Sequence, residues 1–97
     1  MSLLAITTEG KKVVAVTASG SVTINAGATG NATITLPLGP LSKILGVYGV
    51  TGISVSGGTA YIVSFTSTET SVTVTLYNPG TSPATYTVTV TVVVIGV

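Results

Sequence analysis

The sequence ATYTVTVTVVVI at residues 84–95 alternates threonine with apolar residues and then becomes entirely apolar. Successive side chains of a β-strand point to opposite faces, so this period of two predicts a strand with one face toward a core. Tyr86, Val88 and Val90 are expected to face that core, and the threonines are expected to face away from it. Beyond Thr91 the apolar run predicts burial on both faces.

The end of this strand, formed by Val92, Val93, Val94 and Ile95, has two explanations. A strand that is apolar on both faces can lie at the centre of its own sheet, or a neighbouring subunit can cover its outer face. The sequence leaves both open. We expect these four residues to form a subunit contact, with Val93 and Ile95 on the face that carries the threonines.

The same period of two, with many β-branched residues between turn signals, extends through the chain. Strands are expected at residues 3–8, 12–18, 21–25, 31–36, 44–50, 53–56, 60–67, 71–77 and 84–95. Eight or nine short strands without a helix predict an all-β fold, a two-sheet antiparallel sandwich of the jelly-roll or immunoglobulin-like kind. At 97 residues the chain is expected to form one domain, 1–97.

Glycine, proline and asparagine place the expected turns at residues 9–11, 19–20, 26–30, 57–58 and 78–80. Pro37 and Pro40 bracket a segment that cannot continue a ladder, so we expect it to cross between the sheets. Between residues 46 and 52 glycine occupies every third position, which predicts bulges and close strand crossing.

The composition argues against catalysis. Three lysines, two glutamates and no histidine or cysteine give 5% charged residues, against about 25% in ordinary soluble domains. General acid–base chemistry would depend on Glu9 or Glu69, which we interpret as solvated charges in turns. A serine nucleophile would need a lysine as its base, and Ser42 and Lys43 are neighbours in the sequence. Adjacent side chains on a strand point apart, however. Two isolated carboxylates cannot fill a metal shell, so no catalytic, cofactor or metal site is expected.

Charge and hydropathy also restrict the partners. The net charge is +1, and the only adjacent basic residues are Lys11 and Lys12, so nucleic-acid binding is not expected. No apolar run reaches the roughly 18 residues of a membrane helix, and the short apolar start, residues 3–6, is not a recognisable secretory signal. We expect a homo-oligomer that also contacts other structural subunits and has no small-molecule substrate. The scarcity of thermolabile residues favours a hot environment.

Two passages carry a resemblance to known proteins: SVTINAGATGNATITLP at residues 21–37 and VTVTLYNPG at residues 72–80. Both look like strands of immunoglobulin-like and jelly-roll sandwiches of surface and virion proteins. Their threonine- and valine-rich, cysteine-free style resembles small structural proteins of viruses that infect hyperthermophilic archaea. This resemblance implies a virion coat, turret or decoration component that self-assembles through apolar and hydroxyl-rich sheet faces.

Other functions remain open. The composition is also similar to that of archaeal pili and threads, whose subunits donate a strand to the next subunit, and residues 3–8 would then be the donor. The lack of a recognisable signal makes us favour the virion over this extracellular or cell-surface location. A surface- or carbohydrate-binding module is a third alternative, although most of its aromatic candidates are expected in the core: Tyr48, Tyr61, Phe65, Tyr77 and Tyr86. The threonine arrays would suit ice binding, but the strand preference of threonine explains them as well.

Overall fold

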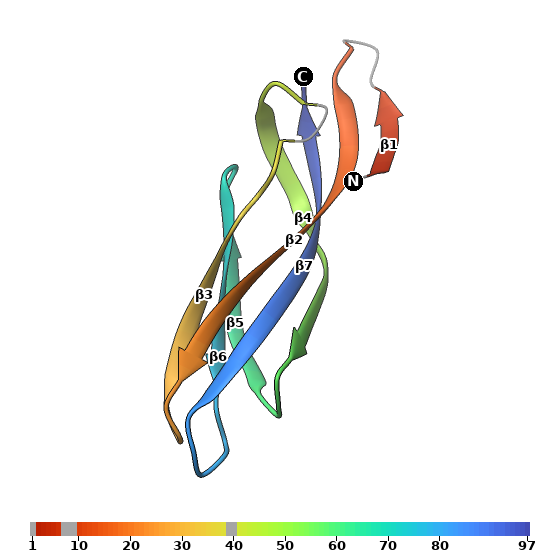
Figure 1. Cartoon of the computed structure of the whole chain (residues 1–97). Coiled ribbons are helices and arrows are strands. Elements are labelled where there is room, and N and C mark those ends of the chain that lie inside the picture. Colours follow the sequence, from red (N-terminus) through yellow and green to blue (C-terminus); the bar gives the residue numbers. More distant parts are fainter. Residues whose placement is uncertain (1, 7–9, 39–40) are drawn as a thin grey trace.

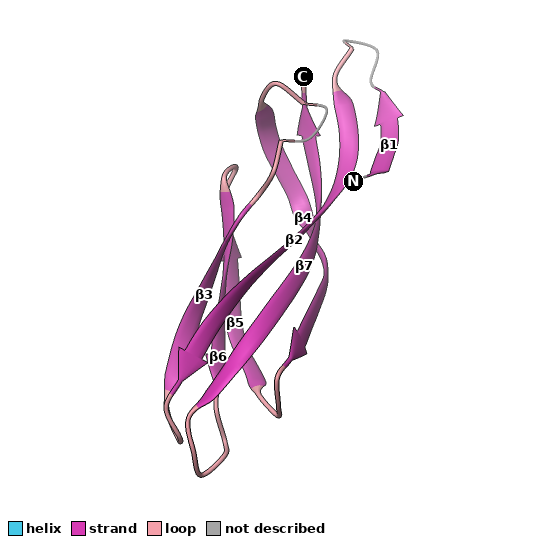
Figure 2. Cartoon of the chain, viewed as in Figure 1, coloured by secondary structure: helices cyan, strands magenta, loops and turns pink. Residues whose placement is uncertain are grey.

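The computed structural model describes residues 2–6, 10–38 and 41–97, which form strands and turns without a helix (Figures 1 and 2). The strands are β1 (Ser2–Ile6), β2 (Lys12–Ile24), β3 (Thr29–Thr35), β4 (Ile44–Ser56), β5 (Tyr61–Ser67), β6 (Ser71–Tyr77) and β7 (Ala84–Gly96). They build two antiparallel sheets in a sandwich-like arrangement. One sheet has the order β1-β2-β7-β4 and the other β3-β6-β5. The molecule is a rod with extents of 53 × 18 × 17 Å.

The strands from β2 to β7 pair from the outside inward, as in one long hairpin that has been folded over. β2 pairs with β7 along its whole length, and β3 pairs with β6. The innermost two, β4 and β5, are joined by a turn but lie in different sheets. The connection from β3 to β4 leads from the three-stranded to the four-stranded sheet, which confirms the sheet crossing expected around Pro37.

One hydrophobic core fills the space between the sheets. The predicted alternation is confirmed in β6 and in β7, whose inward side chains are at most 1% exposed. They are Val72, Val74 and Leu76 from β6, and Tyr86, Val88, Val90, Val92 and Val94 from β7. β7 lies between β2 and β4, so its apolar end is central in the domain's own sheet. This central position explains why both faces of that end are apolar.

The expected turn at Ser19 and Gly20 is wrong, because β2 continues through it. Ser19 pairs with Thr89 and Gly20 with Val88 in an unbroken ladder. A Cβ atom on Gly20 would lie 2.9 Å from the Cγ1 atom of Ile34 in the other sheet. Glycine is therefore needed for the close approach of the two sheets, and the two strands expected at 12–18 and 21–25 are one strand.

The strands expected at 44–50 and 53–56 also form a single strand, β4, which reduces the number of strands to seven. The ladder between β4 and β7 shifts register just before Gly46, Gly49 and Gly52, which confirms the predicted bulges. These glycines lie opposite Ile95, Val93 and Thr91 of β7. Because glycine has no side chain, the edge strand leaves the outer face of β7 uncovered at these positions.

A buried asparagine ties two loops together at one end of the rod. Asn78 is 2% exposed, and its Nδ2 atom donates to the backbone oxygens of Ile24 and Ser82, each at 3.0 Å. Its Oδ1 atom accepts from the backbone nitrogen of Gly80 at 2.9 Å. The β6–β7 loop is thereby fixed to the end of β2.

We predict that Asn78→Ala destabilises the fold by about 1–3 kcal/mol, because buried backbone groups lose their partners. Guanidinium unfolding would measure this difference. Asn25→Ala is the matched control, since Asn25 is exposed in the neighbouring turn, and its cost should stay within about 0.5 kcal/mol. Equal stability of the two variants would contradict this role of Asn78.

Candidate functional site

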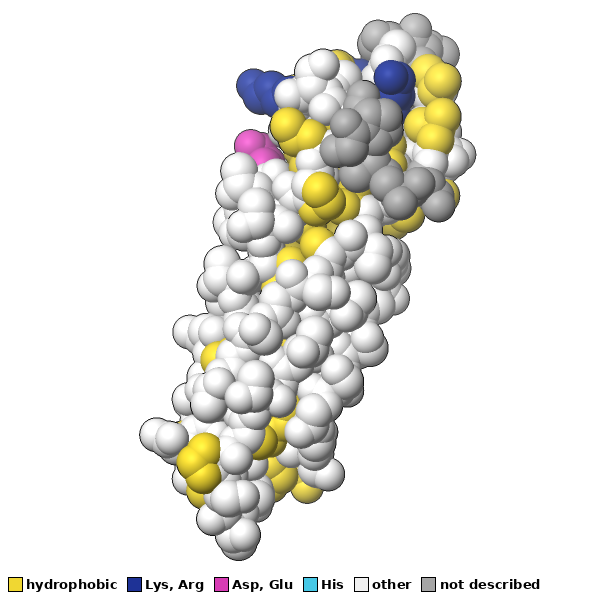
Figure 3. Space-filling view, viewed as in Figure 1, with side chains coloured by type: hydrophobic (Ala, Val, Ile, Leu, Met, Phe, Trp, Pro, Cys, Tyr) yellow, Lys and Arg dark blue, Asp and Glu magenta, His cyan; other side chains and the backbone are white. Residues whose placement is uncertain are grey.

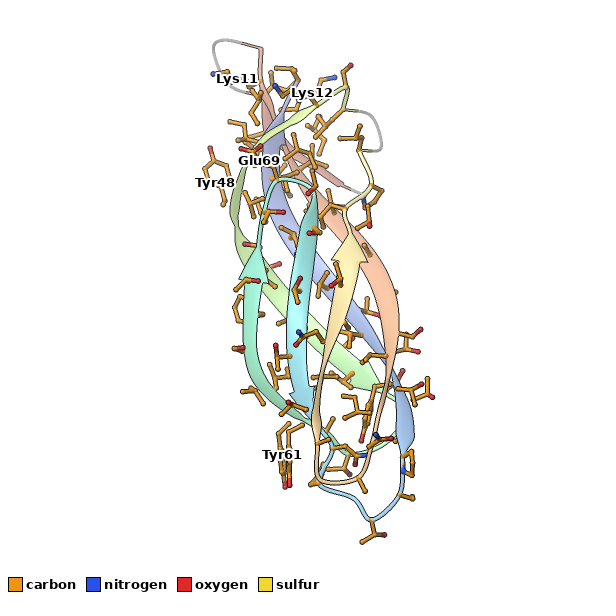
Figure 4. The ribbon with its side chains drawn as sticks, turned by 90° about the vertical axis from the view of Figure 1, so that its left-hand side faces the viewer. Lys11, Lys12, Tyr48, Tyr61 and Glu69 are labelled. Carbon is orange, nitrogen blue, oxygen red and sulfur yellow. The ribbon has the colours of Figure 1, made fainter. Side chains whose placement is uncertain are left out.

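The charged residues of the described chain lie toward one end of the rod. Figure 4 shows Lys11, Lys12 and Glu69 at that end and Tyr61 at the other. Glu69 is exposed in the turn between β5 and β6, as expected from the sequence, whereas Glu9 lies outside the described residues. No group of three or more histidine, cysteine, aspartate or glutamate residues occurs in the described part of the chain.

Ser42 and Lys43 are both exposed and hold the end of the chain. Their backbone nitrogens donate to the Val97 oxygen at 2.6 and 3.3 Å, and the Val97 nitrogen donates to the Lys43 oxygen at 3.0 Å. These bonds give the pair a structural role beside the last strand. The described residues enclose no pocket, so the candidate functional features are surfaces.

The outer face of the four-stranded sheet is divided in two along its length. One part, here called the hydroxyl half, carries only Ser and Thr side chains on β2 and β7. Cross-strand hydroxyl pairs join Thr17 to Thr91 at 3.3 Å, Ser19 to Thr89 at 2.9 Å and Thr23 to Thr85 at 2.8 Å. Because each of these hydroxyls already has a protein partner, removing this face from water costs less than burying unpaired polar groups.

The other part, here called the apolar half, lies toward the charged end. It consists of Ala5, Val13, Ala15, Val93 and Ile95, which share the outer face through the pairs Ala5–Val13, Val13–Ile95 and Ala15–Val93. Ala5 is exposed and the other four are half-buried. The glycines of β4 leave this face open on one side, as described above.

The structure divides the four residues predicted at a subunit contact. Val92 and Val94 point inward and are 0% exposed, so they belong to the core and offer no surface to a partner. Val93 and Ile95 lie in the apolar half and remain candidates. The sequence showed an apolar strand end but not which of its residues would face the second sheet.

β1 adds further exposed apolar surface at the same end of the molecule, partly on the other face of the sheet, because Leu3 and Ile6 pair with Val14 and Lys12 on the inner side. Leu3, Leu4 and Ile6 are 55%, 55% and 61% exposed. β1 is the edge strand beyond β2, and Figure 3 shows hydrophobic side chains gathered at this end of the molecule while most of the remaining visible face is polar. The predicted donor segment 3–8 therefore lies partly in an exposed edge strand, with residues 7 and 8 outside the described part.

β5 is a second exposed edge, at the open side of the three-stranded sheet. All seven of its residues are exposed. Ile62 and Phe65 pair with Leu76 and Val74 of β6, so they share the inner face, yet they are 46% and 49% exposed. The four-stranded sheet does not cover them, because β4 approaches β5 only slightly.

The expectation that most aromatic residues lie in the core is wrong. Only Tyr86 is buried, and its hydroxyl donates to the Thr59 oxygen at 2.9 Å. Tyr48 and Tyr61 are 64% and 59% exposed, and Phe65 is half exposed, as described above. These three lie on the edge strands β4 and β5, where no second sheet covers them. Tyr77 is half-buried and stacks on Tyr61 with ring centroids 6.3 Å apart.

No protein-family model matches the chain, and neither a curated protein nor a solved structure matches it. Within the described residues no helix is long and apolar enough to cross a lipid bilayer. The functional argument therefore rests on the apolar half, the hydroxyl half and the two exposed edges.

Proposed function

We propose that this chain is a non-enzymatic structural subunit of a virion, a coat, turret or decoration component, that assembles with copies of itself and other structural subunits. The observation that carries the proposal is the apolar half. Five apolar side chains lie together on the outer face of one sheet, and each keeps part of its surface exposed. A contiguous apolar patch of this kind is typical of an interaction surface.

The composition of the outer faces supports assembly as well. An interface formed by the apolar half and the adjoining hydroxyl half would bury no charged side chain of β2 or β7, because the one charged residue, Lys12, shares the inner side of β2 with Val14. Desolvating unpaired charges is one of the costs of protein association. Association through these faces avoids that penalty, and apolar burial then supplies the driving force.

The strand order supports a short jelly roll as the topology. In an immunoglobulin-like fold the last strand pairs with the preceding one in the same sheet, whereas β7 and β6 lie in different sheets here. A jelly roll instead rolls up a long hairpin, as the pairs β2–β7 and β3–β6 do. Viral capsid domains use jelly rolls, and so do lectins, so the fold supports the virion hypothesis without deciding it.

A subunit of an extracellular filament is the second candidate, and β1 favours it. A five-residue edge strand with three apolar side chains more than half exposed is suitable for donation to a neighbouring subunit. Donation from one copy to the next does not close on itself, so it produces a filament, whereas a virion component is expected to form a closed ring or trimer. A surface- or carbohydrate-binding module, for which the exposed Tyr61 is the main support, is expected to be monomeric.

We predict that Val93→Lys or Ile95→Lys lowers the mass of the oligomer and leaves the fold intact. Both side chains lie on the outer face, so the lysine stem can lie on the sheet while the ammonium reaches water in the monomer. In an apolar interface the same charge would be unpaired, and association should weaken at least about tenfold. Size-exclusion chromatography with light scattering measures the change.

Thr33→Lys is the matched control, because Thr33 of β3 is exposed on the outer face of the other sheet, away from both halves. It should stay assembled if the apolar half forms the centre of the contact. If Val93→Lys and Ile95→Lys keep the wild-type mass, the apolar half is not the interface. If circular dichroism shows that they unfold, this face belongs to the domain's own core.

We further predict that the oligomer persists when sodium chloride is raised to about 1 M, where the Debye length is about 3 Å. Apolar association does not depend on attraction between charges, and sulfate should strengthen it. Mass measurements at several salt concentrations test this expectation. Dissociation by sodium chloride would show that the few charged residues hold the assembly together.

A further inference from the structure

β5 ends the three-stranded sheet with few of the features that usually protect such an edge. Natural edge strands carry charges, prolines or bulges that prevent another strand from adding to them. β5 has neither a charged residue nor a proline, and its pairing with β6 has one bulge, at Val63. β4, the edge of the other sheet on the same side, is instead interrupted by three bulges. β5 is therefore the more accessible of the two edges.

The core beneath this edge is incomplete. Ile62 and Phe65 face inward beside Leu76 and Val74, which are 0% exposed, yet both keep close to half of their surface in water. A jelly roll with eight strands would continue each sheet by one more strand on this side. Here the chain passes from β5 to β6 through the short turn at residues 68–70, so the place beside β5 stays open.

We propose that β5 pairs with β5 of a second copy, antiparallel and about a twofold axis at Ser64. The three strands of each copy would then form one continuous sheet with the order β3-β6-β5-β5-β6-β3. This inference rests on the proposed self-assembly and assigns it a second contact, separate from the apolar half.

The sequence of β5 is complementary to itself in this register. A twofold axis perpendicular to the sheet keeps each residue on its own face. When the bulged Val63 is skipped, placing Ser64 opposite itself puts Ile62 opposite Phe65 of the second copy on the inner face. The register that places Phe65 opposite itself would leave Ile62 opposite Ser67. Only the pairing centred on Ser64 places the two large apolar residues opposite each other within β5, since centring on Ile62 would put Phe65 opposite residue 60, outside the strand.

The charges of the molecule are compatible with this arrangement. Glu69 lies just beyond β5 at the charged end, and Figure 4 shows it far from Tyr61 at the other end of the strand. In an antiparallel pair Glu69 lies beside the turn at residues 57–60 of the second copy, which contains no charge. Like charges therefore do not meet, and a twofold contact closes as a dimer, unlike donation of β1.

Disulfide trapping with Ser64→Cys tests the pairing, because the chain has no native cysteine. Residues directly opposite in an antiparallel pair have Cα atoms about 5 Å apart, within reach of a disulfide. Oxidation should yield a crosslinked dimer of twice 9.5 kDa on a non-reducing gel. Thr66→Cys is the matched control on the same edge and face. Its two Cα atoms would lie about 14 Å apart at a rise of 3.4 Å per residue, so it should crosslink at least tenfold more slowly.

A charge exchange provides an independent measurement on the full chain. Ile62→Lys should raise the dimer dissociation constant at least tenfold. Adding Phe65→Glu should restore association, since the register places the two new charges opposite each other in the dimer. Failure of the double variant to recover, or equal crosslinking by Ser64→Cys and Thr66→Cys, would overturn the proposal.

Light scattering separates this proposal from the proposed function. If the wild-type chain is assembled but Ser64→Cys does not crosslink, the β5 pairing is wrong and self-assembly stands. If the chain is monomeric at every concentration, both fail. Crosslinking of Leu3→Cys in one copy to Ser64→Cys in another would place β1 at this edge and would replace the β5 pairing with strand donation.

Discussion

The ladder between β2 and β7 is the interaction on which the remaining structure depends. It joins Lys12 through Ile24 to Gly96 through Ala84 without a register shift. This pairing gives both strands the same inner face, so that Val14, Val16, Val92 and Val94 meet as one fully buried surface. It also places β7 between β2 and β4. Because β2 and β7 are paired, the segments that follow β2 and precede β7 are brought together, and β3 pairs with β6 in the second sheet.

A surface with very few charges becomes tolerable because hydroxyl groups satisfy one another. On the four-stranded sheet, three threonine or serine pairs bond across β2 and β7. On the three-stranded sheet, the Thr75 hydroxyl donates to the Asn31 Oδ1 atom at 2.7 Å. Such a surface is polar enough to remain hydrated and costs little to cover. In the proposed assembly the same residues would serve hydration of the free chain and contact with a partner.

Much of the fold could be predicted from local pattern. The alternation in residues 71–77 and 84–95 identified both strands and their inward residues, and the glycine spacing in β4 identified its bulges. Gly20 was misread as a turn, because a glycine required by a close sheet-to-sheet contact has the same local sequence as one required by a turn. Only the position of Ile34 in the opposite sheet distinguishes the two.

The candidate surfaces were less predictable, because they depend on which residues the other elements of the fold leave exposed. Val92 and Val93 are identical in the sequence, yet one is enclosed and the other faces outward. Ile62 and Phe65 face inward like residues of a core strand, and they are exposed because the opposing sheet ends at β4. Whether a residue is left uncovered depends on the topology of the whole domain, and no short segment of the sequence encodes it.

The nesting of the strands has a consequence for how the chain reaches its final form. The partners in the central ladder lie far apart along the chain, with residue 12 beside residue 96, so the core is complete only when β7 has joined the six strands that precede it. Folds dominated by such distant pairings form slowly, since the entropy of closing a long loop is lost before the contacts form. The edge strands are therefore present before the fold is complete. In a cell, high concentrations of nascent chains would favour pairing between copies at that stage, and controlled synthesis or a chaperone would favour correct closure.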